Sequence, residues 1–191
     1  MSVHNTSSNS SSPALRWRLW VDGCGGYLLH SGEQWTVGSI DPQSPADICI
    51  RADWPRHAGV IHRKGTDYFW HSSQSDARPV LIQSGHTLPN SGSAQMTLNC
   101  PNPLSGSATL SLQNPHRFDG HVDGVVLVNN TLLIGPTSDC HIHATEFADR
   151  AILVLRDGVW QGKLNGEDSF MTLTPGRRFS LASLVMTLEP A

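Results

Sequence analysis

The stretch from residue 35 to residue 65 carries the pattern that decides the fold. It opens with Trp35-Thr-Val-Gly38, continues with Asp47-Ile-Cys-Ile50, and ends with Asp53-Trp-Pro-Arg-His-Ala-Gly-Val-Ile61 and Gly65. Nearly the same landmarks return further along the chain, as Leu132-Leu-Ile-Gly135, Asp139-Cys-His-Ile142, Glu146-Phe-Ala-Asp-Arg-Ala-Ile-Leu-Val154 and Gly158. A repeat this long indicates one domain used twice, because arrays of small units have periods of about 20–50 residues.

The last part of each copy aligns with the other without a gap. The paired residues are Trp54 with Phe147, Ala58 with Ala151, Ile61 with Val154, and Arg63 with Arg156. The copies also close alike, as Gly85 followed by Ser93-Ala-Gln-Met-Thr-Leu98 and as Gly176 followed by Ser183-Leu-Val-Met-Thr-Leu188. We expect Gly38 and Gly135 at equivalent strand ends, and Trp54 and Phe147 as core anchors because both are large and apolar.

Composition predicts an all-β protein. Only 15% of the residues are charged, and Ser, Thr, Asn, Gly and Pro are abundant. No sustained helical period of apolar residues is present, whereas short alternating runs between turn residues are frequent. The expected strands include 15–21, 108–112, 139–143 and 181–188, with hairpin turns at Asn129-Asn130 and Asp157-Gly158.

The chain divides into four expected segments. Residues 1–13 form a Ser/Asn-rich tail that cannot bury apolar surface, so we expect disorder there. The first copy occupies 14–112, a linker occupies 113–121, and the shorter second copy occupies 122–191. No stretch approaches the roughly 20 apolar residues of a membrane span, and the tail lacks the apolar core of a secretory signal. We therefore expect a cytoplasmic protein that uses no membrane.

The charge pattern excludes nucleic acid as the expected partner. The formal net charge is -3, and the basic residues form no stripe. The expected partner is a protein or a phosphopeptide.

The order of landmarks resembles the forkhead-associated (FHA) domain, an eleven-stranded β-sandwich that recognises phosphothreonine peptides. In that family a strand ends in Gly-Arg, an Asp-Ile-x-Ile-like strand follows, and Ser-x-x-His precedes the next strand. The resemblance covers most of 15–98 and, more weakly, 122–189. It implies two FHA-like β-sandwiches in tandem, used for protein–protein interaction and signalling.

Both copies depart from the residues that hold phosphate in this family. The arginine, serine and histidine positions hold, in the first copy, Ser39, Pro55 and Ala58. In the second copy they hold Pro136, Ala148 and Ala151. Because each hydrogen bond to a charged group contributes about 1.5–3 kcal/mol, these losses predict a weakened or lost phosphothreonine pocket.

Four residues remain as candidates for the peptide-binding face. Arg56 and His57 follow the expected strand 47–50 and offer a replacement cation, while Ser39 occupies the lost arginine position. In the second copy, Asn165 opens an Asn-Gly pair like that of the family. The alternative function is an active phosphothreonine reader built on the first copy.

A second alternative is a small hydrolase or metal-binding protein using the histidines. His141 and His143 would share a face of a strand over 139–143, because residues two apart point the same way. Only the distant His116 and His121 are available as further ligands, and a zinc site needs three or four. We therefore expect no metal, no cofactor and no catalytic set, and a protein that is not an enzyme.

Overall fold

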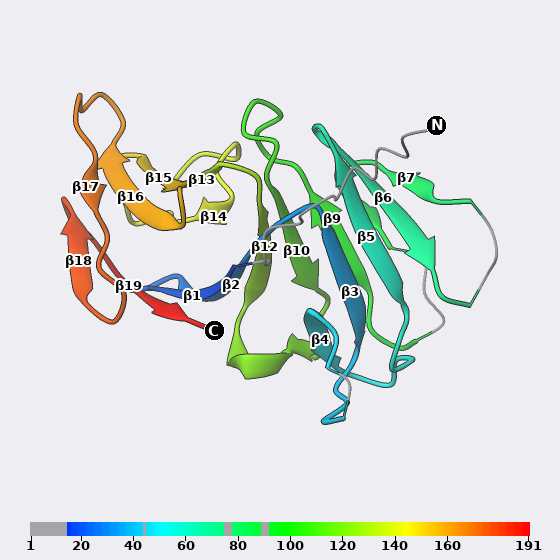
Figure 1. Ribbon diagram of the computed structural model, residues 1–191. Coiled ribbons are helices and arrows are strands. Elements are labelled where there is room, and N and C mark those ends of the chain that lie inside the picture. Colours follow the sequence, from blue (N-terminus) through cyan, green and yellow to red (C-terminus); the bar gives the residue numbers. More distant parts are fainter. Residues whose placement is uncertain (1–14, 44, 75–77, 89–91) are drawn as a thin grey trace, which may run out of the picture.

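The computed structural model describes residues 15–43, 45–74, 78–88 and 92–191 (Figure 1). The tail expected over 1–13 lies outside these residues. The described residues form nineteen strands and one short 3₁₀ helix, so the all-β prediction is confirmed. No helix in this part of the chain has the length and apolar character needed to cross a membrane.

The strands form three sheets, of which the largest runs through the whole molecule (Figure 1). Its eight strands are, in spatial order, β18 (Arg178–Leu181), β19 (Leu184–Pro190), β1 (Arg16–Val21), β2 (Gly25–Ser31), β12 (Gly124–Val128), β10 (Ala108–Leu112), β9 (Met96–Asn99) and β8 (His86–Thr87). All neighbours are antiparallel except β2 and β12, which run parallel at the centre.

Each of the other two sheets is formed by one copy of the repeat, except that β11 of the segment 113–121 joins the six-stranded sheet. The six-stranded sheet has the order β11 (Arg117–Phe118), β4 (Ile48–Arg51), β3 (Gln34–Ser39), β5 (Gly59–Lys64), β6 (Asp67–Ser72) and β7 (Val80–Ile82). The five-stranded sheet has the order β14 (Ile142–His143), β13 (Thr131–Gly135), β15 (Ala151–Arg156), β16 (Val159–Leu164) and β17 (Met171–Thr172). We call residues 15–112 the first half and 122–191 the second half.

Two hydrophobic cores fill the space between these sheets. The first core lies between the eight- and six-stranded sheets, and the second between the eight- and five-stranded sheets. Strand β12 serves both, because Val125 and Leu127 enter the first core while Val126 and Val128 enter the second. Such burial on two faces explains its uninterrupted apolar sequence. The arrangement is sandwich-like on each side of a shared sheet.

The two halves exchange strands across the shared sheet. The last strand of the first half, β10, pairs with β12 of the second half. The last strand of the second half, β19, pairs with β1 of the first half, whose Leu19 and Val21 lie in the second core. Both cores therefore draw on strands from each side of residues 113–121.

Residues 113–121 are more ordered than the expected linker. They contain β11, which pairs with β4, and the 3₁₀ helix Asp119–His121. Phe118 is buried in the first core, which fixes this segment to the six-stranded sheet.

Two expected strands were wrong in extent. The segment 139–143 contributes only Ile142–His143 to a strand, because 139–141 form a turn. The segment 181–188 is a hairpin of β18 and β19 that reverses at Ala182, whose φ is 50°. The closing parts of the halves do correspond as predicted, since the N–H groups of Gly85 and Gly176 donate to the carbonyl oxygens of Leu98 and Leu188.

The gapless alignment of the copies is wrong by one residue. Gly59 lies opposite Val37, and Ala151 lies opposite Ile134, the residues that precede Gly38 and Gly135. Gly59, rather than Ala58, therefore corresponds to Ala151. The sequence alignment placed Gly65 opposite Gly158, but these glycines occupy different positions in their two-residue hairpin turns. Gly65 is the first residue of the turn after β5, whereas Gly158 is the second residue of the turn after β15.

Candidate functional site

Three of the four predicted site residues come together at the end of β3. The loop after β4 folds back over this strand end, so that the Ser39 N–H donates to the Pro55 carbonyl oxygen at 3.0 Å. A Cβ added at Gly38 would lie 1.8 Å from the carbonyl oxygen of Arg56. Glycine is therefore required there by close backbone approach, and it brings Ser39 beside Arg56 and His57.

The guanidinium of Arg56 has a carboxylate beside it. Its Nη1 lies 3.6 Å from Oδ2 of Asp41, in the loop between β3 and β4. The Asp41 side chain is 11% exposed, and its Oδ1 accepts the N–H of Gln43 at 3.0 Å. The Arg56 side chain is 75% exposed. At this loop end the first half therefore presents an accessible cation that already lies next to a fixed negative charge.

The fourth predicted residue, Asn165, follows β16 in the second half, at the position that corresponds to Ser73 after β6 in the first half. Its N–H donates to the Arg150 carbonyl oxygen at 2.7 Å, as that of Ser73 donates to Ala58 at 3.0 Å. This correspondence places Arg150 where the first half has Ala58. The second half therefore has a guanidinium at the position for which the sequence alignment predicted alanine.

Arg150 belongs to a compact polar cluster. Its Nη2 donates to Asp139 Oδ1 at 2.7 Å and to Thr137 Oγ1 at 2.9 Å. The Thr137 hydroxyl also donates to Asp139 Oδ1 at 2.6 Å. The hydrogen bond from Thr137, together with the charge of Arg150, lowers the pKa of Asp139. This carboxylate therefore stays ionised and occupies the donors that an anionic ligand would need.

A comparable ion pair occurs in both halves, although Arg150 corresponds to Ala58 rather than to Arg56. In each, an aspartate from the loop after Gly38 or Gly135 meets an arginine from the next loop. The sequence contains the signal, since Asp41 and Asp139 follow the glycines and Arg56 and Arg150 precede the next strands.

A second correspondence connects Asp47 with His141. In β3 and β13, the N–H of Thr36 donates to Asp47 Oδ2 at 2.8 Å, and that of Leu133 donates to His141 Nδ1 at 2.9 Å. The alignment of Asp47 with Asp139 was therefore wrong by two residues. The reason is that the loop after the glycine is shorter in the second half.

His141 is a buried structural residue and does not form a pair with His143. Because its Nδ1 accepts a hydrogen bond, its Nε2 carries the proton and donates to Ser105 Oγ at 2.9 Å. The Ser105 hydroxyl then donates to the Asn102 carbonyl oxygen at 2.8 Å. Burial lowers the pKa of His141 to about 4. In this tautomer His141 cannot take a proton from Ser105, so the pair is not a nucleophile with its base.

Residues 139–143 do not form the strand on which His141 and His143 were expected to share a face. The buried His141 lies in a bend before β14, whereas the exposed His143 has its Nε2 2.6 Å from the Pro136 carbonyl oxygen. Across the described residues, no group of three or more His, Cys, Asp or Glu side chains is arranged to hold a metal ion.

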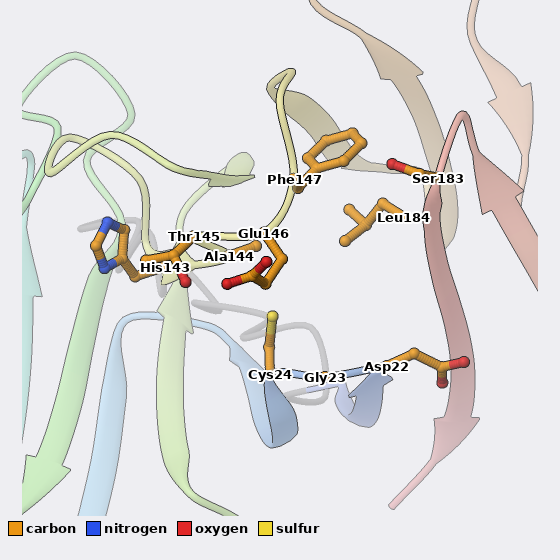
Figure 2. A pocket seen from close by; sticks show the side chains of 10 residues that line it. All are labelled: Asp22, Gly23, Cys24, His143, Ala144, Thr145, Glu146, Phe147, Ser183 and Leu184. Atoms are coloured by element: carbon orange, nitrogen blue, oxygen red, sulfur yellow. The ribbon is translucent and has the colours of Figure 1, made fainter.

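A cavity of about 170 Å³ lies below the loops of the second half (Figure 2). It is lined by the turn Asp22–Cys24, the loop 143–147, and Ser183 and Leu184. Figure 2 shows the Cys24 thiol and the Glu146 carboxylate pointing toward one another across it. Burial raises the pKa of the Cys24 thiol. None of the described residues that line this cavity is an arginine or a lysine, so its chemistry does not suit phosphate.

No family model, curated protein or solved structure matches this chain. The FHA resemblance therefore rests on the order of the sequence motifs and gains nothing from these comparisons.

Proposed function

We propose that this protein is a non-enzymatic interaction module, made of two FHA-like sandwiches that no longer depend on phosphothreonine. The observation that carries the proposal is the aspartate–arginine pair repeated at both loop ends. A phosphate of about -1.5 to -2 charges must find unoccupied donors to replace its water. Here a carboxylate of the same half competes for each guanidinium.

The second half supports the proposal most strongly. Thr137 and Arg150 supply the hydroxyl and guanidinium that suit a phosphate, and Asp139 accepts from both. A phosphopeptide would have to displace this carboxylate, which is held by both bonds and stays beside the site. Intramolecular competition of this kind reduces the affinity for any external anion.

One observation favours the alternative, in which the first half remains a phosphothreonine reader. The contact between Arg56 and Asp41 is longer than its counterpart, and the Arg56 side chain remains largely exposed. Ser39 and His57 lie beside it. In this alternative the peptide binds at the end of β3 only.

A phosphothreonine peptide library, probed with and without phosphatase treatment, distinguishes the two. The proposal predicts that peptides retained by the full chain are retained equally after phosphatase treatment. Phosphate-dependent retention that disappears in Arg56→Ala supports the reader alternative.

Removing the charge of the carboxylate that competes for Arg150 gives a sharper test. Asp139→Asn keeps the size of the side chain but removes its charge, so Arg150 becomes available to phosphate. We expect this variant to bind free phosphothreonine about tenfold or more tightly than the wild type, given the strength of charge-assisted hydrogen bonds. Asp22→Asn, which removes a carboxylate paired with Arg178 elsewhere, is the matched control.

A further inference from the structure

The second half covers two of its outward-facing cations with an aromatic ring. The ring centroid of Phe170 lies 5.1 Å from Cζ of Arg156 and 4.9 Å from Nζ of Lys163. Both distances lie within the range of cation–π attraction. The ring is presented by the acidic segment Glu167-Asp168-Ser-Phe170, which connects β16 with β17.

The strand that follows this ring has an equivalent in the first half. In the five-stranded sheet, Met171 of β17 lies opposite Gly162. In the six-stranded sheet, Val80 of β7 lies opposite Trp70. Trp70 and Gly162 correspond because they lie opposite Ile61 and Leu153 in the preceding strands. These two residues lie in turn opposite Trp35 and Leu132, the second residues of β3 and β13. Strands β7 and β17 therefore begin at equivalent positions.

The residue before each of these strands differs between the halves. The second half has Phe170, preceded by Ser169, and the first half has Pro79, preceded by Arg78. The first half thus loses the covering ring and gains a further cation at this place.

A groove of about 590 Å³ lies where the ring is missing. Its lining residues are His62, Arg63, Lys64, Phe69, Arg78 and Pro79. Lys64 corresponds to Arg156, since each is the last residue of its strand before the hairpin turn. The guanidinium of Arg63 is occupied by the carbonyl oxygens of Gly32 and Gly65. No ion pair within the described residues includes Lys64 or Arg78.

We propose that this groove binds an aromatic side chain that a partner protein presents next to carboxylates, as the second half does for itself with Phe170. Lys64 and Arg78 attract the carboxylates, and Phe69 and Pro79 supply apolar contact for the ring. The proposal rests on the interaction function proposed above and names its surface and partner chemistry. It does not depend on whether the loop ends bind phosphate.

The test uses the chain's own segment as the probe. A synthetic acetylated peptide with the sequence of residues 166–172, Gly-Glu-Asp-Ser-Phe-Met-Thr, is titrated into the full chain and followed by fluorescence anisotropy and amide NMR shifts. We expect saturable binding at one site, with shifts concentrated in β5, β6 and the residues before β7. Replacing the peptide's Phe by Ala should abolish binding, and replacing Glu and Asp by Gln and Asn should weaken it.

Variants of the chain locate the site. Pro79→Phe supplies the missing ring at an exposed position and should block the peptide while preserving the fold, as thermal unfolding would verify. Lys64→Ser and Arg78→Ser should each weaken binding about fivefold, the equivalent of one cation–π or ion-pair contact. Arg117→Ser removes one charge from β11, at the opposite edge of the same sheet, and should leave binding unchanged.

Several outcomes would overturn the proposal. These are the absence of saturable binding, binding that survives Pro79→Phe, tighter binding of a single-stranded oligonucleotide than of the peptide, and self-association of the unliganded chain through this groove. The probe carries no phosphate, so its failure leaves the phosphothreonine screen intact. Phosphate-dependent binding at Arg56 would instead contradict the proposed function without affecting the groove.

Discussion

The two halves use one backbone plan with different core side chains. In the first core, the rings of Trp35 and Tyr68 stack with centroids 6.4 Å apart. The second core has Leu132 and Trp160 at these positions, which lie at matching places in the strand registers. The fold therefore requires large apolar side chains at these positions but does not require a particular pair of them.

A coupled exchange shows how such changes are accommodated. A Cβ added at Gly59 would lie 2.4 Å from the carbonyl oxygen of His71 and 2.6 Å from Cζ2 of Trp70, so the first half keeps glycine there. The second half has Ala151 at this position and Gly162 in place of the tryptophan. The methyl group and the indole ring thus replace one another across neighbouring strands, because protein interiors are close-packed.

Separating the halves should have the largest effect. Produced alone, residues 14–121 lack β12, the partner of β10, and residues 122–191 lack β1, the partner of β19, so we expect both fragments to be unfolded by circular dichroism. Mixed together, they should recover the spectrum of the full chain. A fragment that folds alone with the stability of the full chain would contradict the shared sheet.

Truncating the core residues Trp54 and Phe147 should have the second-largest effect. Trp54 and Phe147 are 6% and 4% exposed, so the prediction that both belong to the core is confirmed. Their replacement by alanine should destabilise the protein by about 3–5 kcal/mol in chemical denaturation. Trp54→Ala should lie at the upper end, since the indole N–H also donates to the Ala94 carbonyl oxygen at 2.9 Å. Leu104→Ala, at a 97% exposed position, is the control that should change nothing.

Acid should destabilise the protein through two buried imidazoles, one from each half. Burial lowers the pKa of His30 and of His141 from 6.5 to about 4. The unfolded chain therefore binds more protons between pH 6.5 and pH 4, and stability falls as the pH is lowered through this window. The loss amounts to at most about 3 kcal/mol per imidazole.

Denaturation of His141→Asn across this pH range checks the assignment. Asn retains an acceptor for the Leu133 N–H but does not titrate, so the pH-dependent loss should shrink to the share of His30. His143→Asn, at an exposed neighbour, should keep the full loss. An unchanged pH dependence in His141→Asn would show that this imidazole does not contribute.

The smallest expected effect tests the coupled exchange. Gly59→Ala should destabilise the first half by about 1–3 kcal/mol, as overpacked substitutions do, measured by urea denaturation. Combining it with Trp70→Gly, which reproduces the pair found in the second half, should cost less than the sum of the two single changes. Additive losses would mean that the two positions are independent.

Local patterns in the sequence predicted the strands, the repeat and the two core anchors. Period-2 alternation and turn residues depend on a few sequence neighbours, so they can be recognised within one short segment. The strand exchange was not predictable in this way, because the apolar run of β12 suits either core. The burial of His141 depends on Ser105, which comes from the other half. The ion pair of Arg150 was missed because Asp139 and Arg150 come from separate loops that only the folded chain brings together.

The most direct test of the central claim is an NMR titration of the full chain with free phosphothreonine. Amide signals report both loop ends at once, through Ser39 and His57 in the first half and Thr137 and Asn165 in the second. The account predicts no saturable shift at either end below millimolar concentrations, which means that any binding free energy at these ends is weaker than about 4 kcal/mol. Saturable shifts at Ser39 and His57 at micromolar phosphothreonine, lost in Arg56→Ala, would contradict it and establish the first half as a phosphothreonine reader.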